Sequence, residues 1–529
     1  MGQNNTAADF KSSGLRLLKK GRHGLMRMVF SRAGLIALFL LLQAALLVAF
    51  FGYLRDYIPH YYTIMTVFSV VMALLVLNGP HDPTAKITWI LVIAVLPAFG
   101  ASLYFYTQSD VGHRMLKDRS AKMISATRGM IPQNRETWSH FLVQAPDAVG
   151  LNRYVNRTGC FPVYENCDVR YFPLGDAMFP ELLRQLEAAE QFIFLEFFIV
   201  DEGVMWGKVL EILARKASQG VDVRLIYDGT CEFFTLPRNY PRRLAELGIQ
   251  CKPFAPIMPF VSTHYNYRDH RKLLVIDGHT AFTGGVNLAD EYINEIKRFG
   301  HWKDTAVMIR GEAARSFTLL FLQMWNLTEK EPVYEPFLSA PVPQWEKAGF
   351  VMPYADCPLD DERVGEWMYL DILNRARDYV YIMTPYLILD GEMETAIKFA
   401  AERGVDVRLI LPGIPDKRIP YALAKTHYAS LLRSGVKIYE YTPGFVHAKV
   451  FVSDDREAVV GTINLDYRSL YHHFECAAYL RGVDCIGQIL ADFRETESFC
   501  LPVTRETLRR EKWYTRLLGH LVKILAPLL

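Results

Sequence analysis

A letter-for-letter internal repeat constrains the fold of this chain more than any other feature. The heptapeptide GVDVRLI occurs at 220–226 and again at 404–410. In each copy a strand-like apolar run and a helical pattern precede the heptapeptide, and a further helix candidate and a short strand follow it. Alternating strands and helices predict an α/β unit with a mainly parallel sheet. We therefore expect two duplicated halves that form one pseudo-twofold body.

Each half also carries the same spaced trio of polar side chains. The trio is His, Lys two positions on, and Asp five positions after the Lys: His270, Lys272 and Asp277 in the first copy, His447, Lys449 and Asp454 in the second. Alternate strand residues share a face, so the His and Lys of each copy should project together. The Asp-Gly pair after the first strand predicts a hairpin. The returning strands would bring Asn287 and Asn464, each 17 positions after its His, towards the histidines.

Charge and cysteine content argue against two classes of protein. The formal net charge is +2 and no Lys/Arg tract stands out, so nucleic acid is not an expected partner. The eight cysteines are scattered, without a Cys-x-x-Cys pair, which argues against a disulfide framework and a zinc site. We expect buried free thiols, and a Cys160–Cys167 pair is the alternative.

The N-terminal region contains three long apolar runs, at 33–54, 61–77 and 87–106. About 20 apolar residues span a bilayer core, so 33–110 is predicted to hold two or three transmembrane helices. Basic clusters precede the first run and follow the third, and both favour the cytoplasm. Three spans cannot satisfy both clusters. Either one run is re-entrant or interfacial, or one cluster lies on the other side.

The C-terminal residues 509–529 carry apolar side chains at helical spacing among basic ones. This pattern predicts an amphipathic helix attracted to anionic lipid, with packing against the protein body as the alternative. The expected domain order is a basic tail (1–32), the transmembrane region (33–110), a linker (111–150), the first half (151–335), a linker (336–350), the second half (351–508) and this helix.

The first trio and its hairpin match the pattern H-x-K-x4-D-x6-G-[GS]-x-N, and the second matches it except at Thr462. The pattern resembles the two HKD motifs of the phospholipase D superfamily, and within it the bacterial cardiolipin synthases. Stretches such as GGVNLADEY, HWKDTAVMIRG and FVHAKVFVSDD carry the resemblance, which runs from about residue 82 to the C-terminus. Gly285 and Thr462 depart from the Ser found in many members. His473 stands where these synthases more often have Asn.

The resemblance implies a metal-free, cofactor-free double displacement on a phosphodiester. Two Lys and two Asn would hold the phosphoryl oxygens, with help from the Thr462 hydroxyl. By analogy His270 attacks phosphorus and His447 is the acid and base, although the residues alone leave the two equivalent. Asp304 and Glu475 match family acids that support the His of the opposite half. Asp277 and Asp454, at hairpin turns, are expected to be structural.

A membrane anchor beside this motif pair favours an enzyme that acts on lipid. The expected reaction transfers a phosphatidyl group from one phosphatidylglycerol to another, giving cardiolipin and glycerol through a phosphohistidine. A phospholipase D, or another phosphatidyltransferase using water or a different alcohol or donor, is the alternative. The expected partners are phosphatidylglycerol and anionic membrane lipid. The expected location is the bacterial cytoplasmic membrane as a multi-pass protein, and no protein partner is indicated.

Overall fold

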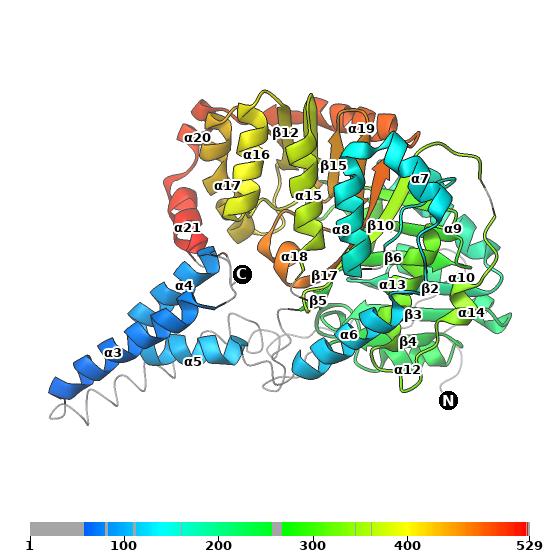
Figure 1. Ribbon diagram of the computed structural model, residues 1–529, viewed down its shortest axis with the longest axis horizontal. Coiled ribbons are helices and arrows are strands. Elements are labelled where there is room, and N and C mark those ends of the chain that lie inside the picture. Colours follow the sequence, from blue (N-terminus) through cyan, green and yellow to red (C-terminus); the bar gives the residue numbers. More distant parts are fainter. Residues whose placement is uncertain are drawn as a thin grey trace, which may run out of the picture. The chain divides into compact units, whose positions relative to one another are not determined.

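The computed structural model describes residues 58–79, 83–108, 113–159, 161–256, 267–343, 345–360, 362–524 and 526 (Figure 1). The chain divides into two compact units. Of the described residues, the smaller unit holds those from 58 to 115 together with 524 and 526. The larger unit holds 116–256 and 267–523.

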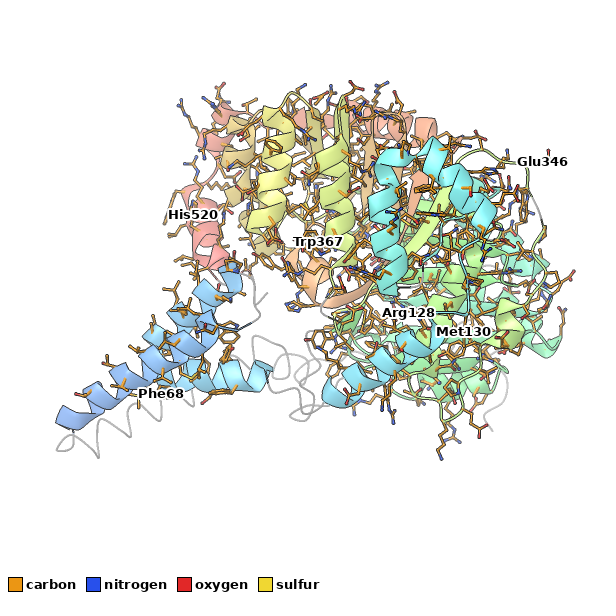
Figure 2. All side chains as sticks on the ribbon, viewed as in Figure 1. Phe68, Arg128, Met130, Glu346, Trp367 and His520 are labelled. Atoms are coloured by element: carbon orange, nitrogen blue, oxygen red, sulfur yellow. The ribbon has the colours of Figure 1, made fainter. Side chains whose placement is uncertain are left out.

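The smaller unit contains three helices: α3 (Ile58–Leu77), α4 (Pro83–Val95) and α5 (Pro97–Gln108). Its core includes Val76 and the edge-on ring pair of Trp89 and Tyr104, whose centroids are 5.3 Å apart. Phe68, labelled in Figure 2, packs partly buried against this core. The helices therefore contact one another through interleaved apolar side chains.

The sequence predicts one continuous helix over the third apolar run, 87–106. In the structure this run is divided between two helices. Leu96 interrupts it and Pro97 begins α5, because proline lacks the N–H that a continuing helix would need. The helices α4 and α5 meet closely at Gly100, where a Cβ would lie 2.8 Å from the Cα of Ile93. The run thus forms a pair of packed short helices.

None of the helices in the described part of the chain has the length and apolarity required to cross a membrane. The first predicted span, 33–54, lies outside the described residues. The second predicted span lies within α3.

The first sheet of the larger unit has the order β1-β9-β7-β6-β2-β3-β4. Its strands are β1 (Asp168–Phe172), β2 (Phe192–Phe197), β3 (Asp222–Asp228), β4 (Gln250–Phe254), β6 (Lys272–Ile276), β7 (Thr280–Gly284) and β9 (Ala306–Arg310). The first GVDVRLI copy forms β3, as the repeat predicts.

The second sheet repeats this plan in the order β10-β17-β16-β15-β11-β12-β13-β18. Its strands are β10 (Phe350–Asp356), β11 (Tyr379–Met383), β12 (Asp406–Pro412), β13 (Lys437–Tyr441), β15 (Val450–Ser453), β16 (Glu457–Gly461), β17 (His473–Arg481) and β18 (Cys500–Pro502). The second heptapeptide copy forms β12, so the duplication is structural.

Both sheets are mixed, and the prediction of mainly parallel sheets was wrong. Among the described strands of these sheets, β2-β3-β4 and β11-β12-β13 pair in parallel, as does the short β5 (Arg268–Asp269) with β17. The strands around each motif hairpin pair antiparallel. A parallel pair needs a long crossover, usually helical, but the hairpins after Ile276 and Ser453 are too short for one. The Lys-to-Asp part of each trio therefore builds antiparallel strands.

Helices cover the sheets, and α15, α16 and α17 lie side by side against the second one (Figure 1).

The segment 111–150, expected as a linker, contains helices as well. The helices after the smaller unit's three are α6 (His113–Thr127), α7 (Arg135–Gln144), η2 (Pro146–Ala148), α8 (Val149–Gly159), α9 (Gly175–Ala188), α10 (Val204–Ser218), α11 (Cys231–Phe234), α12 (Tyr240–Ala245), η3 (Asp290–Ile293), α13 (Ala314–Asn326), α14 (Glu335–Leu338), α15 (Val364–Arg375), α16 (Gly391–Glu402), α17 (Arg418–Arg433), α18 (Tyr467–Tyr471), α19 (Ile486–Ser498), α20 (Arg505–Arg510) and α21 (Trp513–Lys523).

One hydrophobic core runs through both halves of the larger unit. It joins Phe194 and Val275 of the first sheet to Val380 and Val459 of the second. The two halves therefore share one interior. Cys167 is a buried free thiol, and Cys160 lies outside the described residues.

The C-terminal helix α21 packs on α17 and also exposes apolar side chains. Gly519 meets α17 so closely that a Cβ would lie 2.4 Å from the carbonyl oxygen of Ala422. Trp513, Leu517 and Leu521, at helical spacing, stay exposed. The helix is therefore docked on the body, as the second alternative predicts, and its other face is apolar and exposed. Its attraction to anionic lipid stays a prediction.

Candidate active site

Just before its motif histidine, each half sends one short strand across to pair with a strand of the other half. Strand β5 (Arg268–Asp269) runs parallel to the start of β17, and β14 (Gly444–Val446) runs parallel to β8 (His301–Lys303). The backbone N–H of His270 donates to the Phe474 carbonyl at 2.9 Å, and that of His447 donates to the Lys303 carbonyl at 2.7 Å. Each histidine therefore sits at a strand junction between halves, rather than inside the continuous strand that the sequence predicted.

The register of these strand pairs sets each imidazole against an acid of the opposite half. The Nδ1 of His270 lies 2.9 and 3.0 Å from the two carboxylate oxygens of Glu475. The Nδ1 of His447 lies 2.7 Å from Oδ2 of Asp304. Both acids are completely buried. A carboxylate on Nδ1 fixes the ring and leaves Nε2 for chemistry.

The two motif lysines are buried in the same site. The Nζ of Lys272 donates to the His270 carbonyl at 2.6 Å, and Lys449 makes the matching bond to the His447 carbonyl. Burial lowers the pKa of Lys272 to about 8, and burial together with the charge of Lys272 lowers the pKa of Lys449 to about 7. Such groups gain most from an anion, because an anion restores the charged form.

The histidines respond to the same environment. Burial lowers the pKa of His447 to about 4, with Lys449 adding to the effect and Asp304 opposing it. Burial and then Lys272, Lys449 and His447 lower the pKa of His270 well below its usual value. These mutual effects mean that the four basic groups face one electrostatic region. A phosphodiester anion bound among these groups would favour their charged forms.

The two supporting acids, Asp304 and Glu475, have different neighbours. Burial raises the pKa of Asp304, but His447 and Lys449 outweigh this, so that the pKa lies below its usual value. The Thr462 hydroxyl donates to Glu475 and accepts from the Cys476 N–H at 3.0 Å. The resemblance implies that the Thr462 hydroxyl contacts the phosphate of the substrate. In the structure this hydroxyl contacts Glu475, the acid that holds His270.

The two motif asparagines are both buried but are engaged differently. The Oδ1 of Asn287 accepts from the Ile199 N–H at 3.0 Å, and its Nδ2 donates to the Tyr292 hydroxyl at 2.8 Å. The Oδ1 of Asn464 has no hydrogen-bond partner among the described residues. Asn464 is therefore the amide with unused capacity.

The motif aspartates lie at the hairpin turns and hold backbone. Asp277 accepts three N–H groups, those of 190, 191 and 192, each at 2.8 Å. Asp454 accepts those of 377, 378 and 379 at 2.8–2.9 Å. Both have positive φ, 50° and 52°, as tight turns require. Their contacts are those of turn anchors.

The structure adds two aromatic neighbours that were not predicted as site residues. Trp302 lies with its ring 5.5 Å from that of His447, and His473 lies 5.3 Å from His270. Each stands two positions before the supporting acid of its half. Alternate strand residues share a face, so this spacing was a signal that the sequence offered.

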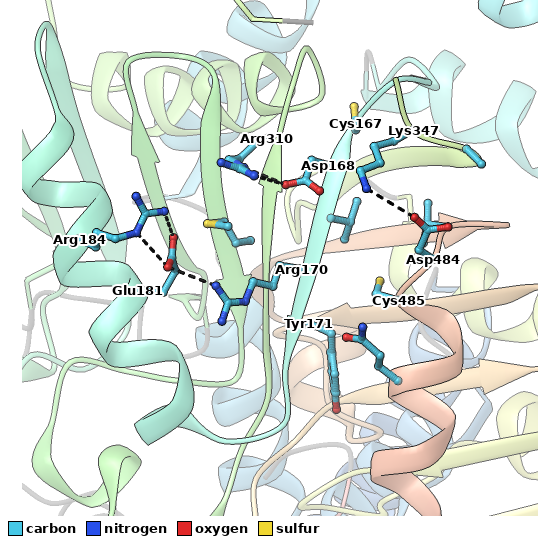
Figure 3. Close-up of a pocket in the computed structure, with 15 residues that line it drawn as sticks. Cys167, Asp168, Arg170, Tyr171, Glu181, Arg184, Arg310, Lys347, Asp484 and Cys485 are labelled. Carbon is cyan, nitrogen blue, oxygen red and sulfur yellow. Dashed lines mark hydrogen bonds and ion pairs between the residues drawn. The ribbon is translucent and has the colours of Figure 1, made fainter. Parts of the chain in front are cut away.

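A separate polar pocket of about 590 Å³ contains none of these groups (Figure 3). Its charged side chains are paired with one another, as in Arg170 with Glu181 and Arg310 with Asp168. This pocket is therefore distinct from the cluster of motif residues.

Comparison with known proteins identifies the family of this chain. The family model described as "Cardiolipin synthase, PLD-like domain" matches residues 182–325 and 369–496, and one described as "Phospholipase D-nuclease N-terminal" matches 63–107. The crystal structure of phosphatidylserine synthase from Haemophilus influenzae superposes with a TM-score of 0.54 at 13% identity, covering 68% of this chain and 95% of that one. That likeness establishes the fold.

Whole-chain relatives extend the match. An uncharacterized protein of Streptococcus mutans is 55% identical over 86% of this chain and 99% of its own length. A cardiolipin synthase of Alkalihalophilus pseudofirmus is 31% identical over 94% of this chain and all of its own. One from a Geobacillus species is 33% identical over 87% of this chain and 92% of its own. The chain therefore belongs to the cardiolipin synthase family of phospholipase D-like proteins.

Proposed function

We propose that this protein is a cardiolipin synthase that joins two phosphatidylglycerol molecules and releases glycerol. The observation that carries the proposal is the pair of buried imidazoles, each held at Nδ1 by a carboxylate of the opposite half. Two oriented imidazoles in a site that also contains Lys272 and Lys449 suit a double displacement at phosphorus. The membership in the cardiolipin synthase family selects this reaction among those of the superfamily.

The first step forms a covalent bond between the enzyme and the lipid. Because Nδ1 of His270 faces Glu475, the neutral ring carries its proton there, and Nε2 has the free lone pair. Nε2 attacks phosphorus, the bond from phosphorus to the headgroup glycerol oxygen breaks, and protonated His447 gives its Nε2 proton to that oxygen. Glycerol leaves and a phosphatidyl-histidine remains.

The second step runs in reverse with a new alcohol. Neutral His447 accepts the proton of the terminal hydroxyl of a second phosphatidylglycerol, whose oxygen attacks phosphorus. The bond between phosphorus and His270 breaks, and cardiolipin forms. The phosphodiester anion raises the low pKa of His447, so the acid form required in the first step is populated when substrate is bound.

The remaining motif residues bind rather than react. Lys272 and Lys449 neutralise the non-bridging oxygens, and the free Oδ1 of Asn464 leaves its amide able to reorient towards the substrate. Asn287, with both amide groups engaged, places its loop beside His447 through Tyr292, whose ring lies 5.4 Å from that imidazole. Asp277 and Asp454 fix the hairpins.

The same proposal includes attachment to the bacterial cytoplasmic membrane. In the smaller unit, α3 exposes Val67, Val70 and Leu74, at the i, i+3, i+7 spacing of one helix face. In the larger unit, α21 exposes Trp513, Leu517 and Leu521, beside basic residues in the same segment. Apolar faces with basic neighbours bind anionic lipid surfaces.

The decisive experiment is a lipid assay with the purified full chain and vesicles of phosphatidylglycerol, in the presence of a chelator. Equal amounts of cardiolipin and glycerol are expected. Phosphatidic acid as the only product would replace the proposal with hydrolysis. A requirement for a second phospholipid as donor would change the substrate assignment.

A further inference from the structure

We propose that His270, His473 and Glu475 form a zinc site through which Zn²⁺ switches the enzyme off. The ligand atoms of these three side chains all lie within 4.8 Å of one another. Among the described residues, no other group of three His, Cys, Asp or Glu side chains meets this criterion. The inhibitory part rests on the proposed function. The binding part stands on geometry alone.

The unused imidazole of His473 is the observation that points to a ligand. His473 is buried, with only 8% of its surface exposed. Neither of its ring nitrogens has a hydrogen-bond partner among the described residues. A buried polar group without a partner is unfavourable, so binding of a ligand that uses the free ring nitrogen is favoured. Its nearest polar neighbour is Oε1 of Glu475, at 3.6 Å from Nδ1.

The ligand atoms of the three side chains all lie within 4.8 Å of one another. Oε1 of Glu475 lies 2.9 Å from Nδ1 of His270 and 3.6 Å from Nδ1 of His473. Tetrahedral zinc with bonds of about 2.1 Å sets its ligands about 3.4 Å apart, so the two distances to Glu475 bracket the separation that zinc requires. Two imidazoles and one carboxylate are a donor set that suits Zn²⁺, whereas Mg²⁺ and Ca²⁺ favour oxygen ligands.

Strand geometry explains why these side chains converge. His473 and Glu475 are alternate residues of β17 and point to the same face, and β5 brings His270 against that face. His472, on the other face, contacts Tyr267 instead. In the first half the residue equivalent to His473 is Trp302, which offers no lone pair to a metal.

Zinc at this point would remove the nucleophile without destroying any bond. Neutral His270 has one proton for two ring nitrogens. When Zn²⁺ occupies Nδ1, the proton moves to Nε2, and the lone pair that attacks phosphorus is lost. The metal also takes the Glu475 carboxylate that oriented the ring. Binding and catalysis therefore exclude each other.

The site is tested by zinc binding to the full chain, measured by equilibrium dialysis without substrate. Replacing His473→Asn should weaken binding at least about 10²-fold, because a ligand is lost. His270→Ala should weaken it similarly, although that variant is inactive. The matched control His472→Asn should bind as the wild type does. Thermal unfolding of each variant checks folding, and His473→Gln provides a second variant if His473→Asn fails to fold.

Activity measurements then test the switch. Zn²⁺ should inhibit wild-type cardiolipin formation over the same concentration range in which it binds, and chelation should restore activity, whereas Mg²⁺ should not inhibit. Equal zinc affinity in the wild type, His473→Asn and His270→Ala would overturn the site. Full activity of the wild type at saturating zinc would overturn the inhibition. Absence of cardiolipin without zinc would instead refute the proposed function, and the dialysis result would still decide the site.

Discussion

The two halves place the same catalytic groups alike but surround them differently. In both halves a crossing strand delivers the His, an acid of the other half holds its Nδ1, and the motif Lys donates to its carbonyl. Beside the acid, however, the first half has Trp302 and the second has His473. The difference teaches that the duplicated scaffold fixes where groups meet, while neighbouring positions are free to diverge.

A second difference concerns the space around each acid. Gly285 has no side chain, and a Cβ there would lie 1.9 Å from Oδ1 of Asp304. At the equivalent position Thr462 donates to the longer Glu475. Gly285 leaves room for Asp304, whereas Thr462 fills space beside Glu475 and donates a hydrogen bond to it. The two halves therefore pack the same position in two different ways. They give the two imidazoles unequal supports.

The strongest test of the comparison removes one imidazole at a time. His270→Ala and His447→Ala should each lower cardiolipin formation by at least about 10³-fold, since each removes a covalent or proton-transfer step. Radiolabelled phosphatidyl groups should be trapped covalently on the wild type during turnover and not on His270→Ala, which lacks the nucleophile. Label trapped on the latter would exchange the two roles.

Removing the charge of each acid should have a smaller effect. Glu475→Gln and Asp304→Asn keep size but lose the carboxylate that orients Nδ1, so a loss of about 10²–10³-fold in kcat is expected, with little change in KM. The kcat and KM values of both variants on phosphatidylglycerol vesicles are the measurement. A loss confined to KM would assign the acids to substrate binding.

The pH profile sharpens the comparison of the lysines. In the proposed mechanism their cations bind the phosphate, and burial lowers the pKa of Lys449 to about 7 and that of Lys272 to about 8. Both are protonated below these values, so kcat/KM should fall as pH rises through 7–8. Lys449→Arg retains its charge and should move the fall to higher pH. An unchanged profile in that variant would remove Lys449 from the explanation.

Exchanges at the two small positions should have the smallest effects, and unequal ones. Gly285→Ser forces its Cβ against Asp304 and should cost about 1–3 kcal/mol in the free energy of unfolding, with reduced activity. Thr462→Ser keeps the hydroxyl that contacts Glu475 and should cost less than about 1 kcal/mol. Chemical denaturation measures both. Equal costs would mean that the halves tolerate change alike at this position.

Much of this architecture was predictable because it depends on local patterns. The repeated heptapeptide became β3 and β12, and the turns at Asp277 and Asp454 became hairpins, since strand alternation and turn chemistry act over a few residues. The sheets were predicted wrongly as mainly parallel, because the strand order combines helical crossovers and tight hairpins. The break before Pro97 was missed because its long apolar run outweighed the single proline.

The sequence by itself determined the two trios, their hairpins and the kind of chemistry that two histidines and two lysines can perform on a phosphate. The residues alone did not say which acid holds which imidazole; only the resemblance implied that pairing. Tertiary structure decided it, because the partners are 205 and 143 positions apart in the chain. They meet only through parallel strand pairs formed between the halves, which also brought His473 to His270.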